Sequence, residues 1–114
     1  MREDDAVASF AALAQPLRLG MVRALVKAGA QGLSAGALAQ DMGVAPSKLS
    51  FHLKILSEAG LVGFERHARS LIYRVHFAQM AGLVQFMLAE CCEGSGAGLG
   101  ISGALRHTEH GERR

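Results

Sequence analysis

The chain has 114 residues, of which half are apolar, and a formal net charge of +2 at neutral pH. This length suits a single domain with its own core, and charged residues and glycines break every apolar run before the ~18 residues that a membrane-spanning helix needs. The acidic first ten residues lack the apolar stretch of a secretory signal, so we expect a cytoplasmic protein whose thiols stay reduced.

The basic residues concentrate in the middle of the chain. Residues 16–76 contain eight Lys/Arg and three Asp/Glu, whereas the segments on either side are net acidic. Localised positive charge is typical of a surface that binds phosphate. A solvated protein surface accounts for the same charge, so the motifs must decide between the two interpretations.

Helical spacing of apolar residues predicts four helices in the first sixty residues. Gln15-Pro16 separates the first two, because proline disfavours a helical residue before it and suits the first helical position after it. Ser34 can cap the third helix, and glycines end the later ones. The predicted ranges are 6–14, 16–29, 34–43 and 46–60. A short third helix, a tight turn and a longer fourth helix are typical of a helix-turn-helix, whose second helix enters the DNA major groove.

A β-hairpin and a further helix are predicted after the fourth helix. The β-prone runs 61–66 and 70–75 flank a polar stretch, 67–69, and together they predict a hairpin that serves as a wing. From residue 77 the apolar period is helical again, and this last helix ends at Cys91-Cys92. We therefore predict one mostly α-helical domain with a small hairpin over residues 1–93, and a flexible glycine-rich tail over residues 94–114.

The fourth helix and the wing carry the candidate DNA contacts. Leu49, Leu53 and Leu56 fall at i, i+4 and i+7 and form a buried stripe. The remaining faces of this helix hold polar side chains that can bond bases or phosphates, and the wing can reach phosphate or a minor groove. A plain hydrophilic surface has the same composition, and an interior-facing His52 would serve the fold instead. The candidates are Ser47, Lys48, Ser50, Phe51, His52, Lys54, Arg66, His67 and Arg69.

Cys91 and Cys92 are the only cysteines of the chain, and they are adjacent. Thiolates select soft cations and metalloids over harder ions, so the pair predicts a site for a soft metal ion or a metalloid such as trivalent arsenic. Two sulfurs fit a methylated arsenical best, whereas arsenite needs a third ligand from elsewhere; antimony(III) is equally soft. A packing role for a buried thiol and redox sensing by the pair are alternatives.

Three strings give the chain a resemblance to the ArsR family of winged-helix metal-sensing repressors over roughly residues 6–92. They are Ala14-x-Pro16-x-Arg18-Leu19, Leu49-Ser50-x-His52-Leu53 and Ala59-Gly60-Leu61-Val62. The resemblance implies a winged helix-turn-helix and a homodimer built from the first and last helices. It also implies repression through a roughly two-fold symmetric DNA operator.

The resemblance also bears on the effector. The family's better-known Cys-x-Cys arsenic site on the third helix is absent, because residues 33–38 contain no thiol. The last helix also lacks the Asp and His pairs of the zinc-type sensors. Members with vicinal cysteines near the end of the last helix respond to trivalent arsenicals, and Cys91-Cys92 match that pattern.

The prediction is therefore a repressor, not an enzyme, that needs no cofactor and releases its operator when it binds arsenite, methylarsenite or antimonite. A redox- or persulfide-sensing repressor on the same scaffold and a non-sensing DNA-binding module are the alternatives.

Overall fold

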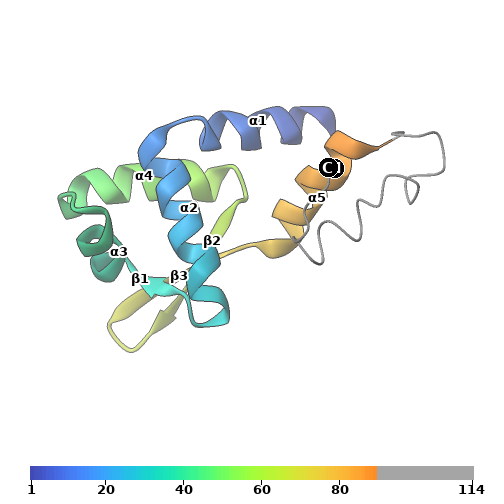
Figure 1. The fold of residues 1–114 in the computed structure, drawn as a ribbon. Helices are drawn as coiled ribbons and strands as arrows, with labels where there is room; N and C mark the ends of the chain where they lie inside the picture. Colours follow the sequence, from blue (N-terminus) through green and yellow to red (C-terminus); the bar gives the residue numbers. More distant parts are fainter. Residues whose placement is uncertain (90–114) are drawn as a thin grey trace, which may run out of the picture. The chain divides into compact units, whose positions relative to one another are not determined.

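The structure is a computed structural model that describes residues 1–89, so Cys91, Cys92 and the predicted tail lie outside the described residues. The internal contacts divide the chain into Met1–Leu83 and Val84–Arg114, and the packing described below is that of the first unit. Figure 1 shows the order of the elements. They are α1 (Glu3–Leu13), α2 (Pro16–Ala28), a 3-10 turn (Gly29–Gln31), β1 (Leu33–Ser34), α3 (Ala35–Met42), α4 (Pro46–Glu58), β2 (Val62–His67), β3 (Ser70–Val75) and α5 (Phe77–Leu88).

The helix boundaries follow the predicted capping residues. Pro16 occupies the first turn of α2, and the Gln15 side chain accepts a hydrogen bond of 2.7 Å from the Arg18 backbone N–H. The Ser34 hydroxyl accepts a hydrogen bond of 3.1 Å from the Ala37 N–H and so caps α3. Each cap satisfies an amide that has no partner within its own helix. The predicted starts of these two helices are therefore confirmed.

The core lies where α2, α3 and α4 meet the base of the hairpin. Apolar side chains from all of these elements are fully or almost fully buried, together with Ala12 of α1. The largest are Met21, Leu25, Leu38, Leu49, Leu53, Leu56 and Leu61. Burial of a Leu or Met side chain contributes roughly 1.5–3 kcal/mol of stabilisation, so this cluster fixes the position of α4 relative to α2 and α3.

The sheet has three antiparallel strands in the order β1-β3-β2. The predicted hairpin is confirmed, but His67 belongs to β2 and pairs with Ser70, so the connecting loop is two residues long, with Ala68 at φ 56°. The strand β1, which pairs Leu33 with Tyr73, was not predicted. A strand of two residues is too short to show the alternating pattern by which strands are recognised.

The last helix differs from the prediction at its end. The described helix α5 ends at Leu88, before the cysteines, and the Ala89 N–H donates to the Phe86 carbonyl at 3.3 Å. None of the helices among residues 1–89 combines the length and the apolar character that a membrane crossing requires. The expected fold class, mostly helical with a small hairpin wing beside a helix-turn-helix, is confirmed.

Candidate DNA-binding surface

The second helix of the helix-turn-helix, α4, is held by its apolar stripe and exposes its polar face. Residues 43–45 join α3 to α4, and Gly43 takes the left-handed conformation (φ 68°, ψ 35°) that lets the chain reverse there. The predicted stripe is confirmed, because Leu49, Leu53 and Leu56 are all buried. The five candidate residues on the remaining faces of α4 are exposed: Ser47, Lys48, Ser50, Phe51 and Lys54.

The N-terminal end of α4 adds backbone donors to this surface. Its N-cap is Ala45, which offers no side-chain acceptor, and Pro46 occupies the first turn. The amides of a first helical turn have no acceptor within their helix, and together they attract anions such as phosphate. The DNA contacts predicted from the sequence are side chains of α4 and the wing, although an alanine cap before a proline also indicates a helix end with free amides.

His52 does not share the exposure of its neighbours. Its side chain is only 7% exposed, and its Nδ1 lies 3.0 Å from Nη1 of Arg18 in α2. Burial, with smaller contributions from the Arg18 and Lys48 charges, lowers the pKa of His52 from its usual value of 6.5. The proposed base or phosphate contact by His52 therefore disagrees with its position, and the alternative of an interior histidine that serves the fold agrees with it.

The wing presents three basic candidates, all exposed: Arg66, His67 and Arg69. His67 Nε2 lies 3.5 Å from Glu65 Oε1, and Arg74 Nη1 donates to the same oxygen at 2.7 Å. The hydrogen bond from Arg74, followed by that from His67, lowers the pKa of Glu65. Because Glu65 is paired with Arg74, this carboxylate offsets the charge of Arg74 more than the charges of Arg66 and Arg69.

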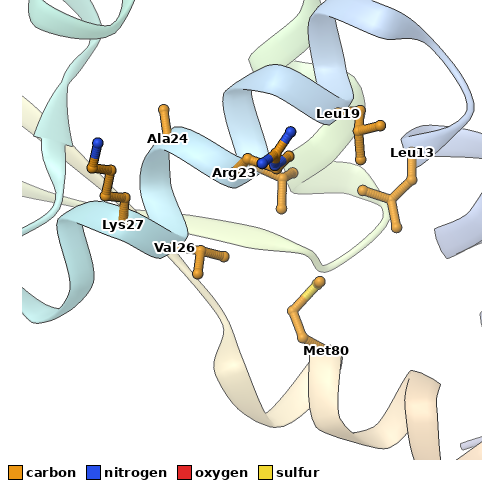
Figure 2. Close-up of a pocket in the computed structure, with 8 residues that line it drawn as sticks. Leu13, Leu19, Arg23, Ala24, Val26, Lys27 and Met80 are labelled. Atoms are coloured by element: carbon orange, nitrogen blue, oxygen red, sulfur yellow. The ribbon is translucent and has the colours of Figure 1, made fainter. Parts of the chain in front are cut away.

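The structure divides the basic residues of the middle segment into three groups. Arg18 and Arg74 form hydrogen bonds within the fold. Lys48, Lys54 and the two wing arginines are exposed on α4 and the hairpin. The third group is on α2, where two exposed cations border an apolar groove of about 490 Å³ (Figure 2). The groove is lined by Leu13, Leu19, Val22, Arg23, Ala24, Val26, Lys27 and Met80.

The predicted metalloid ligands, Cys91 and Cys92, are not among the described residues, so the structure gives no geometry for them. Within residues 1–89, no group of three His, Cys, Asp or Glu side chains lies close enough together to hold a metal ion.

Comparison with known proteins relates the chain to DNA-binding regulators. A helix-turn-helix domain model matches residues 13–62. The biofilm growth-associated repressor of Xylella fastidiosa is 34% identical over 80 residues, which are 70% of this chain and 68% of that protein. The crystal structure of the transcriptional repressor BigR from Xylella fastidiosa is 31% identical, with a TM-score of 0.61 over 80% of this chain and 90% of that one.

A third relative has a known assembly. The solution structure of the homodimeric winged helix-turn-helix domain of Mb0332 from Mycobacterium bovis, a possible ArsR-family transcriptional regulator, is 27% identical. Its TM-score is 0.61 over 79% of this chain and 83% of that one. The chain belongs to the ArsR family of winged-helix transcriptional regulators. This family is a class of DNA-binding proteins and not of enzymes.

Two polar side chains that connect elements of this ArsR-family fold were not singled out from the sequence. Arg18 joins α1 to α4 through the Ala12 carbonyl and His52. Gln79, in the first turn of α5, donates to Ser9 Oγ of α1 at 3.1 Å and to the Ala59 carbonyl at the end of α4 at 3.4 Å. Arg18 and His52 did stand in two of the strings that carry the family resemblance, whereas nothing in the sequence distinguished Gln79.

Proposed function

We propose that this ArsR-family chain is a homodimeric repressor that releases its operator when a trivalent arsenical binds Cys91 and Cys92. The observation that carries the proposal is the vicinal pair itself, the only thiols in a chain of a DNA-binding regulator family. Soft thiolates prefer soft metalloids, and the absence of other cysteines leaves the pair as the one place where the chain can bind arsenic through sulfur.

The chemistry favours a methylated arsenical. Methylarsenite carries one As–C bond and two hydroxyl groups. Each thiol forms an As–S bond while its proton leaves with one hydroxyl as water, so two thiols complete the three bonds of arsenic. Inorganic arsenite forms the same two bonds and keeps one hydroxyl, or exchanges it for a third thiol. Antimonite reacts in the same way, because antimony(III) is also soft.

The exposed residues of α4 and the wing support the DNA-binding half of the proposal. Ser47, Lys48, Ser50, Phe51 and Lys54 share the exposed surface of a helix that this motif places in the major groove. A two-fold dimer presents two such helices to the two halves of an operator. Val7 and Phe10, which are 60% and 40% exposed on α1, provide apolar surface that a second copy can cover.

The first turn of α5 offers a route from the effector to the DNA. Gln79 bonds both the carbonyl of Ala59, the C-cap of α4, and the hydroxyl of the fully buried Ser9 in α1. A change in α5 that alters the Gln79 contacts therefore acts on the end of α4. A hundredfold loss of operator affinity requires a coupling free energy of about 2.7 kcal/mol, which is within the usual allosteric range.

The experiment uses reduced protein on a labelled operator selected from a random DNA library. We expect methylarsenite or phenylarsine oxide to release the DNA at near-stoichiometric amounts. Cys91→Ser and Cys92→Ser should bind the operator with unchanged affinity but no longer respond. The matched control is Ser57→Cys, which adds a thiol outside the pair and should leave the response unchanged.

Other outcomes assign the pair differently. Release by an oxidant or a persulfide donor alone would make the chain a redox or persulfide sensor. Operator binding that no reagent changes would make it a non-sensing DNA-binding module. If both serine variants still released DNA with arsenicals, the cysteine pair would not be the sensing site.

A further inference from the structure

One side chain joins three helices next to the exposed face of α4. Arg18 of α2 donates from Nε to the Ala12 carbonyl at 2.7 Å, and its Nη1 lies 3.0 Å from His52 Nδ1. Ala12 is in the last turn of α1, where carbonyl groups have no partner within the helix and the partial charge is negative. The guanidinium therefore ties the end of α1 to the middle of α4.

The chemistry of this contact fixes the protonation state of His52. A guanidinium has five N–H donors and no acceptor, so the Arg18–His52 contact is a hydrogen bond only if Nδ1 of His52 carries no proton. His52 must then be neutral, with its proton on Nε2. A protonated His52 would place a second cation against Arg18 in a site where the imidazole is only 7% exposed.

The position of His52 makes this contact relevant to DNA reading. His52 lies beside the apolar stripe of α4, between the buried Leu49 and Leu53, and it is the buried polar residue of this helix. Its ring packs edge-on against the exposed Phe51, with 5.2 Å between the ring centroids. A leucine stripe tolerates small rotations of a helix, because dispersion contacts are not directional, whereas a hydrogen bond is directional.

We propose that Arg18 is a positioning residue for DNA recognition: through neutral His52 it sets the rotation of α4 relative to α1, so that operator affinity depends on this contact. The proposal rests on DNA binding through α4 and not on the identity of the effector. Loss of the contact leaves the core residues in place and changes the directions of Lys48, Phe51 and their exposed neighbours.

The proposal has a pH-dependent consequence. The charged groups that act on His52 are Arg18 from α2 and Lys48 from α4 itself, and both are cations. From α1, the group at this site is the uncharged Ala12 carbonyl, which Arg18 holds. Acidification that protonates His52 breaks the hydrogen bond with Arg18, so operator affinity should fall. A histidine on the DNA-facing surface would instead gain affinity for phosphate when it is protonated, so operator affinity would rise on acidification rather than fall.

The test measures operator affinity of the full-length protein between about pH 8 and pH 5.5, the range in which histidine titrates, with circular dichroism at each pH. Arg18→Gln should lose about tenfold in affinity at neutral pH while it remains folded, as expected for a hydrogen bond to a charged group. Arg18→Lys should recover only part of the loss, because an ammonium lacks the planar fork that reaches both partners.

His52→Asn is the decisive variant, because its amide oxygen can take the place of Nδ1 as acceptor and does not titrate. It should bind the operator as the wild type does at neutral pH and should lack the loss of affinity on acidification. His76→Asn, which changes a histidine that is bonded to the Gly60 carbonyl at 3.0 Å, is the matched control and should keep the wild-type profile.

Two results would overturn the proposal: a folded Arg18→Gln protein with wild-type affinity, or a His52→Asn protein with the same acid loss as the wild type. If Arg18→Gln does not fold, the His52→Asn comparison decides by itself. An arsenical response that persists in His52→Asn would separate this contact from the sensing site, so that the two proposals can fail independently.

Discussion

The two wing arginines should account for a defined share of the salt dependence of DNA binding. Arg66 and Arg69 are exposed, and neither forms an ion pair with a carboxylate among the described residues. Each phosphate contact contributes about 0.9 to the slope of log K against log salt concentration. Removing both arginines from the two protomers of the proposed dimer should therefore make this negative slope shallower by about 3.6. The complete set of Lys48, Lys54, Arg66 and Arg69 predicts a slope of about −7 for the dimer.

The assay is fluorescence anisotropy of a labelled operator at several salt concentrations, with wild type and the double variant Arg66→Ala/Arg69→Ala. The control is Arg23→Gln/Lys27→Gln, which removes two other exposed cations beside the apolar groove of α2. This control lowers the net charge by the same amount but should leave the slope unchanged. If the wing variant kept the wild-type slope, or if the α2 variant lost as much, the wing would not contact phosphate and the assignment of the DNA-binding surface would be wrong.

Three further predictions concern stability. Because the pKa of His52 is lowered in the native state, the unfolded chain binds more protons than the native one. The contribution of His52 to the free energy of unfolding should therefore be fully present above about pH 6.5 and be lost as pH falls through the native pKa. Urea unfolding at several pH values should show this dependence in the wild type and not in His52→Asn. Gly32→Ala should lower the free energy of unfolding by about 1–3 kcal/mol through backbone strain alone, because Gly32 has φ 67°, and the added Cβ would also meet the Tyr73 carbonyl. Gly36→Ala in α3 has open space around the added Cβ and should be neutral or stabilising in thermal unfolding. Leu53→Ala should lower the free energy of unfolding by about 2–5 kcal/mol, because Leu53 is buried. Phe51, which is 62% exposed, should change it by less than about 0.5 kcal/mol when replaced by alanine, and its loss should instead weaken operator binding. Equal losses of stability in the two variants would contradict the orientation of α4.

The helices could be predicted from the sequence because each carries its own signals. Pro16, Ser34 and Gly43 act through local backbone chemistry, and the leucine stripe of α4 repeats with the helical period. The strand β1 carries no such signal. It exists because Leu33 pairs with Tyr73, a residue far along the chain, and Gly32 permits the close approach to β3. Structure that depends on a distant partner leaves no periodic trace in its own segment.

The same distinction explains which parts of the DNA-binding surface were predictable. Exposure of Ser47, Lys48 and Lys54 follows from the stripe on the opposite face, so the helical period alone places them. His52 occupies a position at the edge of that stripe, where the period allows either burial or exposure. In the structure the His52 side chain is buried and contacts Arg18, which is 34 residues away in the sequence.

Arg18 shows why family strings can be informative before their function is known. The strings that contain Arg18 and His52 are separated along the chain, yet their side chains meet within 3.0 Å. Buried polar groups need specific partners, because an unpaired one costs about 1–3 kcal/mol. A substitution of either Arg18 or His52 would thus remove a hydrogen-bond partner of the other residue. Two polar residues in separate strings of a mostly apolar pattern are therefore candidates for mutual contact, and in this chain that contact, together with the Arg18–Ala12 hydrogen bond, links α1 to α4.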